Sequence, residues 1–595
     1  MMKVSDYIAL RLKNIHKISD VFMVSGGGAM HLNDSFGRYL NYICNHNEQA
    51  SGLCGEGYGR VNQKPCVVNV TTGPGGLNAL NGVFGSWTDS VPVIFISGQV
   101  KFSTTIASCP ELALRQLGDQ EVDIISVVKP LTKYAEMITD PKKVKYCLDK
   151  AVYLATHGRF GPVWLDIPHN VQSAMIDEND LIDFIPPAEN KPELKIAEVI
   201  AKLQQAQRPL LVAGHGIRLS GQIENFKKLL EKLNIPAVTT FNGFDILEDD
   251  NPNYVGRIGT IGQRAGNFVL QNADCVLFLG TRNNIRQASY NWENFAKNAY
   301  KIAVDIDNAE LQKPTVRPDL TVNADLADFI PALLEKTPEL NTLKWLEYGQ
   351  NLRRKYDFTH TPEYQHKDGK INAYAAIKSI CDATEENDLC VMANATATIC
   401  TFQLAGIKKG QRFFSNSGDA SMGYDLPAAI GACVAADRRK TICLAGDGSI
   451  MMNLQELQTI KHNNLPIKIF IINNDGYISI KQTQNNFFEG RHCGDGRNSG
   501  VSLPDFVKVG EAFGIKSLRV DKPENLDKAI AETLEGNEPV ICEVMVNPDY
   551  VFTPKLSARV LPDGSMESPS LEDMFPFLPR EEFAENMICC KENKK

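Results

Sequence analysis

The sequence lacks any long hydrophobic run. Its apolar stretches, of which residues 467–472 are among the longest, fall well short of the roughly 20 residues that a membrane-spanning helix needs. The N-terminus also lacks a basic segment followed by an apolar one, which is the pattern of a secretory signal peptide. We therefore expect an unprocessed cytoplasmic chain with no membrane partner.

An excess of basic residues is lacking as well. The 62 Lys and Arg residues are outnumbered by 71 Asp and Glu residues, which gives a formal net charge of −9. Without a basic surface to neutralise a phosphate backbone, nucleic acid is not an expected partner. The 15 cysteines form no CxxC pair, and there is no HExxH motif. The thiols are expected to be reduced, including the adjacent pair Cys589 and Cys590 in the polar tail.

Length and composition indicate several folded domains. The 595 residues are several times more than one hydrophobic core usually organises, so about two to four domains are expected. The composition, 43% hydrophobic and 22% charged, is that of a globular protein and excludes a disordered chain.

Short apolar runs bounded by Gly, Asn or Pro predict strands in three blocks of the chain. Their continuous rather than alternating hydrophobicity indicates strands covered by helices on both faces, as in parallel sheets. We therefore predict an α/β fold of three doubly wound parallel-sheet domains. The expected strands are residues 20–24, 66–70 and 93–97, then 209–213, 237–241, 275–280 and 302–306, and finally 389–393, 441–445, 467–473 and 540–546.

Polar, proline-bearing stretches between the blocks indicate the domain boundaries. Residues 185–195 and 337–370 are the expected linkers. From about residue 552 the chain is rich in Pro and Ser without periodicity, which predicts an extended arm followed by a frayed tail. The predicted organisation is therefore three domains at 1–185, 196–337 and 370–550, with an arm and tail at 551–595.

Two polar turns in the third block follow consecutive predicted strands. Gly446-Asp447-Gly448-Ser449 follows one strand, and Asn473-Asn474-Asp475-Gly476 ends the next, with Asn474 27 positions after Asp447. Parallel strands bring such a carboxylate and amide to one sheet edge, where both can ligate a hard cation such as Mg²⁺. A helix expected to begin near Asn453, with Glu456 as part of a capping box, would direct its positive end toward a diphosphate there. Each turn by itself is a common structural feature.

Together, the two turns resemble the signature of thiamine diphosphate (ThDP) enzymes, GDG followed after a helix and a strand by NN. The resemblance implies that Asp447, Asn474 and the Gly476 carbonyl ligate Mg²⁺. It also implies ThDP contacts from Gly446, Gly448, Ser449, Tyr477 and Ile478.

ThDP chemistry requires a carboxylic acid hydrogen-bonded to N1′ of the cofactor's pyrimidine. Glu48, in Asn-His-Asn-Glu-Gln-Ala, lies just past an expected apolar strand and ahead of a Gly-rich helix, and it matches the family's glutamate. Taken alone, a glutamate in this position is more often the solvated start of a helix. The resemblance to the family reverses that interpretation.

The resemblance extends over nearly the whole chain and narrows to the acetolactate synthase-like group. The matching segments are 21–28 (VFMVSGGG), 71–78 (TTGPGGLN), 120–123 (QEVD), 130–133 (PLTK), 394–397 (NATA) and 421–431 (SMGYDLPAAIG). They imply catalytic roles for Gly28, Gln120 and Lys133 besides Glu48, and further ThDP contacts from Thr72, Asn78, Asn394, Ala395, Thr396 and Met422. An ordinary strand-to-helix turn would resemble the 394–397 segment, and Met422 alone resembles a flexible gap-filler.

The central domain of acetolactate synthases binds FAD, and several fragments of the middle block are similar to it. Glycines at strand ends are a weak signal, because any doubly wound domain has them. In addition, the family's Phe-Asp-Asp-Arg run reads Asn283-Asn284-Ile285-Arg286 here. FAD is therefore an expected cofactor, with contacts implied for Arg159, Gly214, Gly216, Thr240, Gly256, Arg257, Gly280, Arg282, Arg286, Asp305 and Asp325.

The expected reaction is carboligation. Pyruvate decarboxylases resemble this chain but use a His-His pair and two acids as proton donors, and Gly27 and Ile480 stand where the acids would be. Without proton donors, the two-carbon unit formed from pyruvate should instead attack a second carbonyl. Glyoxylate carboligases lack the activating glutamate that this chain has at position 48. Gln120 and the Gly26–Gly28 amides would steer that carbonyl, while Lys133 and Arg286 would orient the acceptor or the flavin.

The acceptor is predicted from a smaller set of residues. Acetolactate synthases have Trp and Met just beyond the Asn-Asn motif, whereas residues 475–488 here form a more polar run. This run, residues 284–287 and the tail resemble the ThDP flavoenzymes of branched-chain sugar pathways, such as the yersiniose pathway, which implies a nucleotide-linked ketosugar acceptor. An acetolactate synthase, a pyruvate oxidase and a catalytically silent ThDP-binding protein are the alternatives. The family further implies a dimer or tetramer with active sites between subunits.

Overall fold

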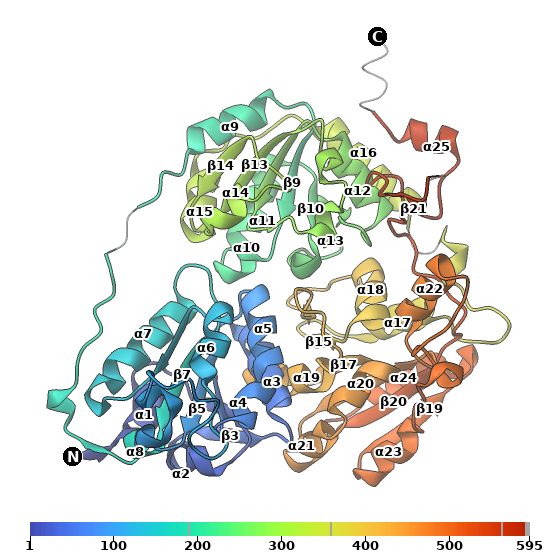
Figure 1. Cartoon of the computed structure of the whole chain (residues 1–595). Coiled ribbons are helices and arrows are strands. Elements are labelled where there is room, and N and C mark those ends of the chain that lie inside the picture. Colours follow the sequence, from blue (N-terminus) through green and yellow to red (C-terminus); the bar gives the residue numbers. More distant parts are fainter. Residues whose placement is uncertain (189–190, 358–359, 561–562, 589–595) are drawn as a thin grey trace.

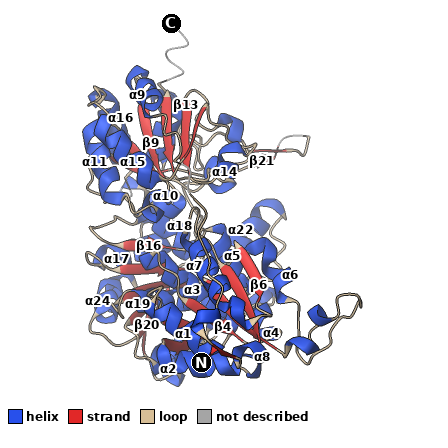
Figure 2. Cartoon of the chain, turned by 90° about the vertical axis from the view of Figure 1, so that its left-hand side faces the viewer, coloured by secondary structure: helices blue, strands red, loops and turns tan. Residues whose placement is uncertain are grey.

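The computed structural model describes residues 1–188, 191–357, 360–560 and 563–588. It contains three six-stranded sheets, each flanked by helices, and all strand pairs within them are parallel. In Figure 1 the central domain lies above, with the N-terminal domain at lower left and the C-terminal domain at lower right. Figure 2 shows the same two tiers from the side. The predicted fold of three doubly wound α/β domains is confirmed.

The two lower domains share one topology. When the strands of each sheet are numbered along the chain, both sheets have the order 2-1-3-4-6-5. The N-terminal sheet runs β3 (Asn41–Cys44), β2 (Asp20–Met23), β4 (Val67–Val70), β5 (Ile94–Gln99), β7 (Val163–Pro168) and β6 (Tyr134–Met137). The C-terminal sheet runs β16 (Arg412–Phe414), β15 (Leu389–Met392), β17 (Thr441–Gly446), β18 (Ile467–Asn473), β20 (Val540–Met545) and β19 (Lys516–Val520).

The central sheet has the order 3-2-1-4-5-6, which is that of dinucleotide-binding domains. In such sheets ligands bind at the carboxyl ends of the strands, where the order reverses, here between β9 and β12. Its strands are β11 (Tyr254–Arg257), β10 (Ala237–Thr239), β9 (Pro209–Ala213), β12 (Cys275–Leu279), β13 (Tyr300–Asp305) and β14 (Leu320–Asn323).

Amphipathic helices cover both faces of each sheet, which explains the continuous hydrophobicity of the central strands. In the N-terminal domain these include α1 (Val4–Asn14), α2 (Met30–Tyr39), α5 (Leu80–Thr88) and α7 (Val144–Thr156). The central domain has α9 (Ile196–Gln205), α11 (Ile223–Leu233), α12 (Arg264–Asn272) and α15 (Leu326–Lys336). The C-terminal domain has α17 (Ala373–Ala383), α18 (Ala395–Leu404), α22 (Ile478–Phe487), α23 (Phe506–Ala512) and α24 (Leu526–Leu534).

The N- and C-terminal domains pack through α3 (Glu48–Asn62) and α19 (Asp425–Ala435), which lie side by side in Figure 1. Small residues allow the two backbones to approach closely. A Cβ atom at Gly57 would lie 2.3 Å from the Ala428 carbonyl oxygen, and one at Gly431 would lie 1.9 Å from that of Cys54. This contact fixes the direction of α3 and therefore the position of Glu48 at its N-terminus.

The second predicted linker contains a helix. Residues 337–370 contain α16 (Leu343–Lys355), which packs on the central domain. Trp345 is buried there, and its Nε1 donates a hydrogen bond to the Pro209 carbonyl at 2.9 Å. The charges that suggested a linker lie on the outer face of this helix, because only one stripe of it is buried.

The segment predicted as an arm and tail packs against the central domain over the described residues 563–588. Leu571, Met574 and Met587 are buried against the central domain. Asn267 Nδ2, on α12, donates to the Leu571 carbonyl at 3.0 Å. A short α25 (Arg580–Glu585) follows, so the tail crosses from the C-terminal domain to the central one (Figure 1). Irregularly spaced apolar residues carry this packing, which periodicity cannot detect.

Membrane-spanning helices and the state of the cysteines can be examined for the described residues. Among the described residues, no helix is long and apolar enough to cross a membrane. The 13 described cysteines are free thiols, and most of them are buried. Cys589 and Cys590 lie outside the described residues.

Candidate active site

A buried carboxylate and an amide meet where two neighbouring strands end. β17 and β18 pair in parallel, so Asp447 and Asn474 leave the same edge of the sheet. Asp447 Oδ2 accepts hydrogen bonds from the backbone N–H groups of Asn474 (2.9 Å) and Gly476 (3.1 Å). Asp447 is only 2% exposed, and its burial raises the pKa of the carboxyl to about 7. The structure thus brings together the three residues predicted to ligate a cation.

The Asn474 side chain has one oxygen available in this arrangement. Its Nδ2 donates to Tyr550 Oη at 3.1 Å and to Thr396 Oγ1 at 3.4 Å. Its Oδ1 is buried and has no hydrogen-bond partner among the described residues. A buried carboxylate, an amide oxygen and a backbone carbonyl are the kind of ligands that Mg²⁺ takes. The residues present therefore fit the predicted cation.

We call Asp447, Asn474 and Gly476 the clamp. Two glycines allow the backbone to pack closely around it. A Cβ atom at Gly448 would lie 2.1 Å from the Tyr477 ring. One at Gly476, where φ is +132°, would lie 2.2 Å from the Asp495 carbonyl oxygen. Both positions therefore depend on glycine, the first because of space and the second because of both space and backbone conformation.

The helix at this edge differs from the prediction. α20 (Asp447–Ile450) begins directly after β17, whereas α21 (Glu456–His462) begins at Glu456 without a side-chain cap. The capping box predicted between Asn453 and Glu456 is therefore wrong. The buried Glu456 carboxylate instead accepts a hydrogen bond from Asn45 Nδ2 at 2.8 Å, so it joins the C-terminal domain to the N-terminal one.

A pocket of about 1060 Å³ opens beside the clamp, and we call it the clamp pocket. Its walls include the N-terminal ends of α18 and α22, and Phe241 and Arg286 of the central domain. Every residue predicted to bind ThDP in the C-terminal domain lines it, namely Asn394, Ala395, Thr396, Met422, Gly446, Gly448, Ser449, Tyr477 and Ile478.

The predicted site residues Glu48, Thr72, Asn78 and Gln120 of the N-terminal domain form a second group, which we call the Glu48 group. Glu48 begins α3, and Asn78 Nδ2 donates to its Oε2 at 3.0 Å. A Cβ atom at Gly75 would lie 3.6 Å from Glu48 Oε1, and one at Gly73 would lie 1.8 Å from the Gln120 carbonyl oxygen. Glu48, Thr72, Asn78 and Gln120 therefore belong to neighbouring segments at the carboxyl edge of this sheet.

Gly28 belongs to the same group, but its backbone is already engaged. Its N–H donates to Thr71 Oγ1 at 3.1 Å, and its carbonyl accepts from Gln172 Nε2 at 2.7 Å. The Gly28 N–H is therefore used within the chain in this arrangement, and its role in steering the substrate carbonyl stays a prediction.

The two groups do not meet within one chain. All residues that line the clamp pocket come from the central and C-terminal domains. The Glu48 group is flanked instead by exposed apolar residues. Leu77 is 42% exposed, and Phe84 and Trp87 on α5 are each 38% exposed.

The ammonium group of Lys133, for which a catalytic role is predicted, contacts the backbone of a neighbouring loop. Its Nζ donates to the carbonyls of His157 and Arg159, both at 2.6 Å. Burial lowers the pKa of Lys133 to about 8. Its ammonium group is thus used to hold the backbone beside Arg159.

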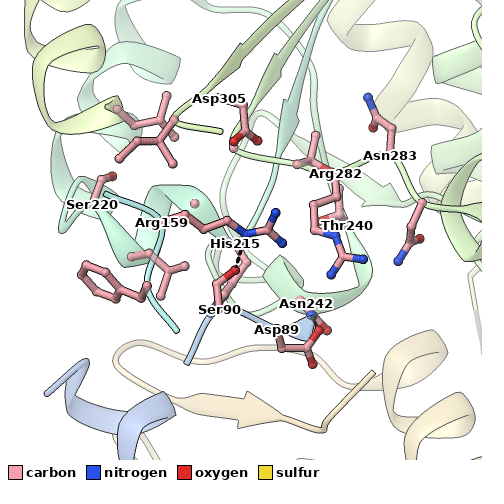
Figure 3. Close-up of a pocket in the computed structure, with 18 of the residues that line it drawn as sticks. Asp89, Ser90, Arg159, His215, Ser220, Thr240, Asn242, Arg282, Asn283 and Asp305 are labelled. Carbon is pink, nitrogen blue, oxygen red and sulfur yellow. Dashed lines mark hydrogen bonds between the residues drawn. The ribbon is translucent and has the colours of Figure 1, made fainter. Parts of the chain in front are cut away.

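A second pocket, the central pocket, lies at the switch point of the central sheet and encloses about 1010 Å³ (Figure 3). In the figure Arg159 and Arg282 reach into it from opposite sides, and Asp305 lies above them. Arg159 also pairs with Asp307 (2.8 Å) and Glu310 (2.9 Å). Seven residues predicted to contact FAD line this pocket: Arg159, Gly216, Thr240, Gly280, Arg282, Asp305 and Asp325.

The other predicted FAD contacts lie outside the lining of this pocket. Gly214 supports it from behind, since a Cβ atom there would lie 2.2 Å from the Gly280 carbonyl oxygen. Gly256 packs near Gln263, with a Cβ to Oε1 distance of 2.8 Å. The buried Arg257 guanidinium donates to carbonyls at the end of α18, including that of Thr401 at 3.3 Å, so the prediction that it contacts FAD is not supported. Arg286 lines the clamp pocket.

The two pockets adjoin, because Phe241 and Ser417 line both. Several residues of the central pocket were not predicted, among them Ser90, His215, Asn242 and Gln287. The ring nitrogen Nδ1 of His215 is buried without a partner among the described residues. Ser90 and Asn242 are single polar residues that no motif marks, whereas His215 and Gln287 lie within segments that resemble known families.

Comparison with known protein families decides the class. Residues 2–126 match the N-terminal TPP binding domain of thiamine pyrophosphate enzymes, residues 196–333 match the central domain, and residues 395–544 match the C-terminal TPP binding domain. Thiamine pyrophosphate is another name for ThDP. The chain belongs to the thiamine pyrophosphate enzymes.

The similarity between this thiamine pyrophosphate enzyme and its relatives extends over nearly its full length. It is 29% identical to the acetolactate synthase isozyme 2 large subunit of Escherichia coli K12 over 562 residues, 94% of this chain and 97% of that protein. It is 30% identical to the acetolactate synthase large subunit of Lactococcus lactis over 556 residues, 91% of this chain and 92% of that protein. A probable acetolactate synthase large subunit of Methanococcus aeolicus is also 30% identical, over 90% of this chain and 91% of that protein.

These relatives make the chain a ThDP-dependent, acetolactate synthase-like enzyme that forms carbon–carbon bonds. They correspond better to the acetolactate synthase alternative than to the ketosugar acceptor that the sequence analysis favoured.

Proposed function

We propose that this enzyme decarboxylates pyruvate and joins the resulting two-carbon unit to the carbonyl carbon of a 2-oxo acid. In the simplest case two pyruvate ions and one proton give one acetolactate ion and CO₂. The bond to the carboxylate breaks, a bond to the acceptor carbon forms, and the acceptor oxygen takes the proton. The observation that carries the proposal is the clamp of Asp447 and Asn474 in a pocket that also contains the cation Arg286.

The clamp residues would hold the cofactor through Mg²⁺. Asp447, Asn474 Oδ1 and the Gly476 carbonyl would ligate the metal, and the N-terminal ends of α18 and α20 would face the diphosphate. Bound ThDP supplies a carbon nucleophile and an electron sink for decarboxylation. The pocket walls would hold the reacting carbon away from bulk water.

Glu48 would hold or move the proton at the pyrimidine nitrogen. Asn78 fixes one carboxylate oxygen of Glu48, so the other keeps a defined direction. No residue of the Glu48 group lines the clamp pocket of the same chain. We therefore propose that Glu48 of a second copy completes the active site at the clamp pocket. The exposed Leu77, Phe84 and Trp87 beside Glu48 support burial by such a copy.

Arg286 supports a carboxylate-bearing acceptor. Its guanidinium lies over the Phe241 ring, 5.2 Å from the centroid, and forms no ion pair with any described residue. Its carbonyl accepts from Thr260 N (3.0 Å) and Thr260 Oγ1 (2.8 Å), so the backbone is fixed. A planar cation held in this way suits bidentate binding of the carboxylate of a 2-oxo acid.

A nucleotide-linked ketosugar is the second candidate acceptor. The clamp-pocket wall beyond the Asn-Asn turn is made by Tyr477, Ile478, Ser479 and Ile480. It therefore has no tryptophan there, and Ser479 offers a hydroxyl that can bind a sugar.

We further propose that the central pocket binds FAD. Gly216 and Gly280 line this pocket and pack closely against each other, with a Cβ at Gly216 only 2.7 Å from the Gly280 Cα, so a larger residue does not fit at this position. Arg159 and Arg282 offer charge for a diphosphate, and His215 Nδ1 offers an unused polar atom. Bound FAD would add redox capacity beside the clamp pocket.

Product analysis tests the proposal. Purified protein with ThDP and Mg²⁺ would be given ¹³C-pyruvate alone, with 2-oxobutyrate, or with a CDP-linked 4-ketosugar, and the products identified by NMR and mass spectrometry. Acetolactate in the first tube and a mixed acetohydroxy acid in the second are expected. A sugar that gains a two-carbon unit, with little acetolactate, would favour the second candidate. Acetate with flavin bleaching, or acetaldehyde alone, would contradict carboligation.

A further inference from the structure

Three segments of the Glu48 group converge at the end of one strand. β5 ends at Gln99, which is 1% exposed. Around it lie the turn that carries Thr72, the loop that carries Gln120, and the glycine segment that ends at Gly28. A Cβ atom at Gly98 would lie 2.2 Å from the Gly28 carbonyl oxygen, so this strand end touches the glycine segment directly.

The Gln99 amide uses all its hydrogen-bonding positions to connect these segments. Oε1 accepts from Thr72 Oγ1 at 2.5 Å and from the Val100 N–H at 2.9 Å. Nε2 donates to the Val122 carbonyl at 3.2 Å and to Asp166 Oδ2 at 3.1 Å. An amide has two acceptor sites and two donor hydrogens, so no other side-chain group of this size satisfies all four partners.

Asp166 determines which end of the amide faces which segment. It lies on β7, is 0% exposed, and its Oδ1 accepts from Ser97 Oγ at 2.6 Å. The Ser97 oxygen in turn accepts from Trp164 Nε1 at 2.8 Å. The Val122 carbonyl can only accept, and Asp166 Oδ2 accepts from the same NH₂ group, so together they direct the Gln99 oxygen toward Thr72.

The loop that precedes Val122 is held together by its own hydrogen bonds. The Glu121 carboxylate accepts from the backbone N–H groups of Ile106, Leu117 (3.0 Å) and Gly118 (3.1 Å). Gln120 has a positive φ of 61° and its carbonyl abuts Gly73. Since the loop is internally fixed, the Gln99 contact at its base determines where the whole loop lies relative to the Thr72 turn.

We propose that Gln99, oriented by Asp166, is a positioning residue that sets the spacing between the Thr72 turn and the Gln120 loop. Gln99 is 1% exposed and its side chain contacts the Thr72 turn and the base of the Gln120 loop, so it acts through these two segments. The inference rests on the proposed function, in which Thr72 contacts ThDP and Gln120 faces the substrates. Neither residue of the pair belongs to the motifs that match ThDP enzymes in the sequence.

The test exchanges the amide of Gln99 and the carboxylate of Asp166 between the two positions. In Gln99→Glu, one carboxylate oxygen would face the Val122 carbonyl and the Asp166 carboxylate, with Asp123 and Glu121 as further acids near Asp166. We expect kcat to fall about tenfold at pH 8, the effect of roughly one buried polar group left unsatisfied, and to recover several-fold at pH 6 as a proton is shared. Gln99→Glu combined with Asp166→Asn restores a donor opposite the new acid, and we expect most of the activity to return at pH 8.

Two controls separate positioning from a general loss of structure. Gln99→Ala should lose activity to a similar extent at both pH values, because it offers no proton site. Ser97 contacts Asp166 but neither loop, so the variant Ser97→Ala should keep kcat within about threefold of the wild type. Recovery of Gln99→Glu at pH 6 together with rescue by Asp166→Asn supports the proposal. Loss that is equal at both pH values and is not rescued, or no loss at all, would overturn it.

ThDP affinity, measured by calorimetry, makes the test independent of the acceptor. If the wild-type enzyme makes no carboligation product, the proposed function fails, but the positioning of Thr72 can still be measured. Gln99→Glu should then bind ThDP several-fold more weakly than the wild type at pH 8, with recovery at pH 6 and in the double variant. Unchanged affinity in all variants would overturn the positioning role as well.

Discussion

The backbone N–H of Asn474 donates to Asp447 Oδ2 at 2.9 Å, while the side-chain Oδ1 of Asn474 remains buried without a partner among the described residues. An unsatisfied buried oxygen costs about 1–3 kcal/mol, so its retention next to a buried carboxylate calls for a ligand. A divalent cation satisfies both groups at once.

Removal of the clamp carboxylate should therefore abolish metal-dependent cofactor binding. We expect Asp447→Ala to weaken ThDP binding at least about 100-fold in the presence of Mg²⁺ and to make it insensitive to added EDTA. Calorimetric titration with ThDP, with and without Mg²⁺, measures both effects. Asp475→Asn, at the exposed position between Asn474 and Gly476 where φ is +59°, is the matched control and should bind normally. Normal Mg²⁺-dependent binding by Asp447→Ala would exclude the clamp as the metal site.

Glu48 should matter for turnover and much less for cofactor binding. Replacement by Gln keeps the shape and the contact with Asn78 but removes the proton-transfer group. We expect CO₂ release from pyruvate to fall roughly 100-fold or more, as is typical when a general acid or base is lost, with ThDP affinity within about threefold of the wild type. The exposed Glu111→Gln should leave both quantities unchanged. Turnover of Glu48→Gln close to the wild-type rate would contradict this role.

Arg286 should affect the acceptor rather than the donor. We expect Arg286→Gln to raise the apparent KM for 2-oxobutyrate about tenfold or more when pyruvate is saturating, because a charged hydrogen bond is lost, while ThDP affinity changes little. Product ratios at several acceptor concentrations give this value. Arg497→Gln, an exposed arginine elsewhere in the C-terminal domain, should have no effect. An unchanged KM would argue against a carboxylate-bearing acceptor at this position.

The buried Asp166 predicts a pH dependence of stability. Burial raises the pKa of its carboxyl to about 7 in the folded chain, against about 3.9 in an unfolded one. The folded state therefore binds the extra proton between these values, and stability falls as pH rises through this range. Asp166→Asn removes the titration, so its melting temperature relative to the wild type should increase between pH 5 and pH 7.5. The exposed Asp177→Asn should show no such trend, and a difference that is constant with pH would contradict the assignment.

Much of the fold was accessible from the sequence because buried parallel strands are continuous apolar runs. β9 and β18 agree with their predicted bounds, and both are central. The strands that were missed include the edge strand β19, where one side faces solvent and polar residues interrupt the run. The apolar strand expected just before Glu48 corresponds to another edge strand, β3. β7 was missed although it is fully buried, because Asp166 breaks its hydrophobic pattern.

The candidate site likewise contains residues that the sequence could predict and residues that it could not. Asp447 and Asn474 were predictable because each follows a strand end at which the topology determines the place of the side chain. Lys133 and Arg257 were assigned to the site by resemblance alone, and a long basic side chain can turn toward backbone carbonyls instead, as both do here. Gln99 carried no signal, since its role depends on partners that are distant in the sequence.

The central claim is that one catalytic site needs Glu48 from one chain and the clamp from another. Co-expression of Glu48→Gln and Asp447→Ala chains with different tags, followed by isolation of the mixed assembly, tests it most directly through acetolactate formation from pyruvate. If the halves come from two chains, each mixed pair contains one fully intact site, and we expect about half the activity of the wild type while either variant alone is inactive. A mixed assembly as inactive as the single variants would show that each site is built within one chain and would contradict the account.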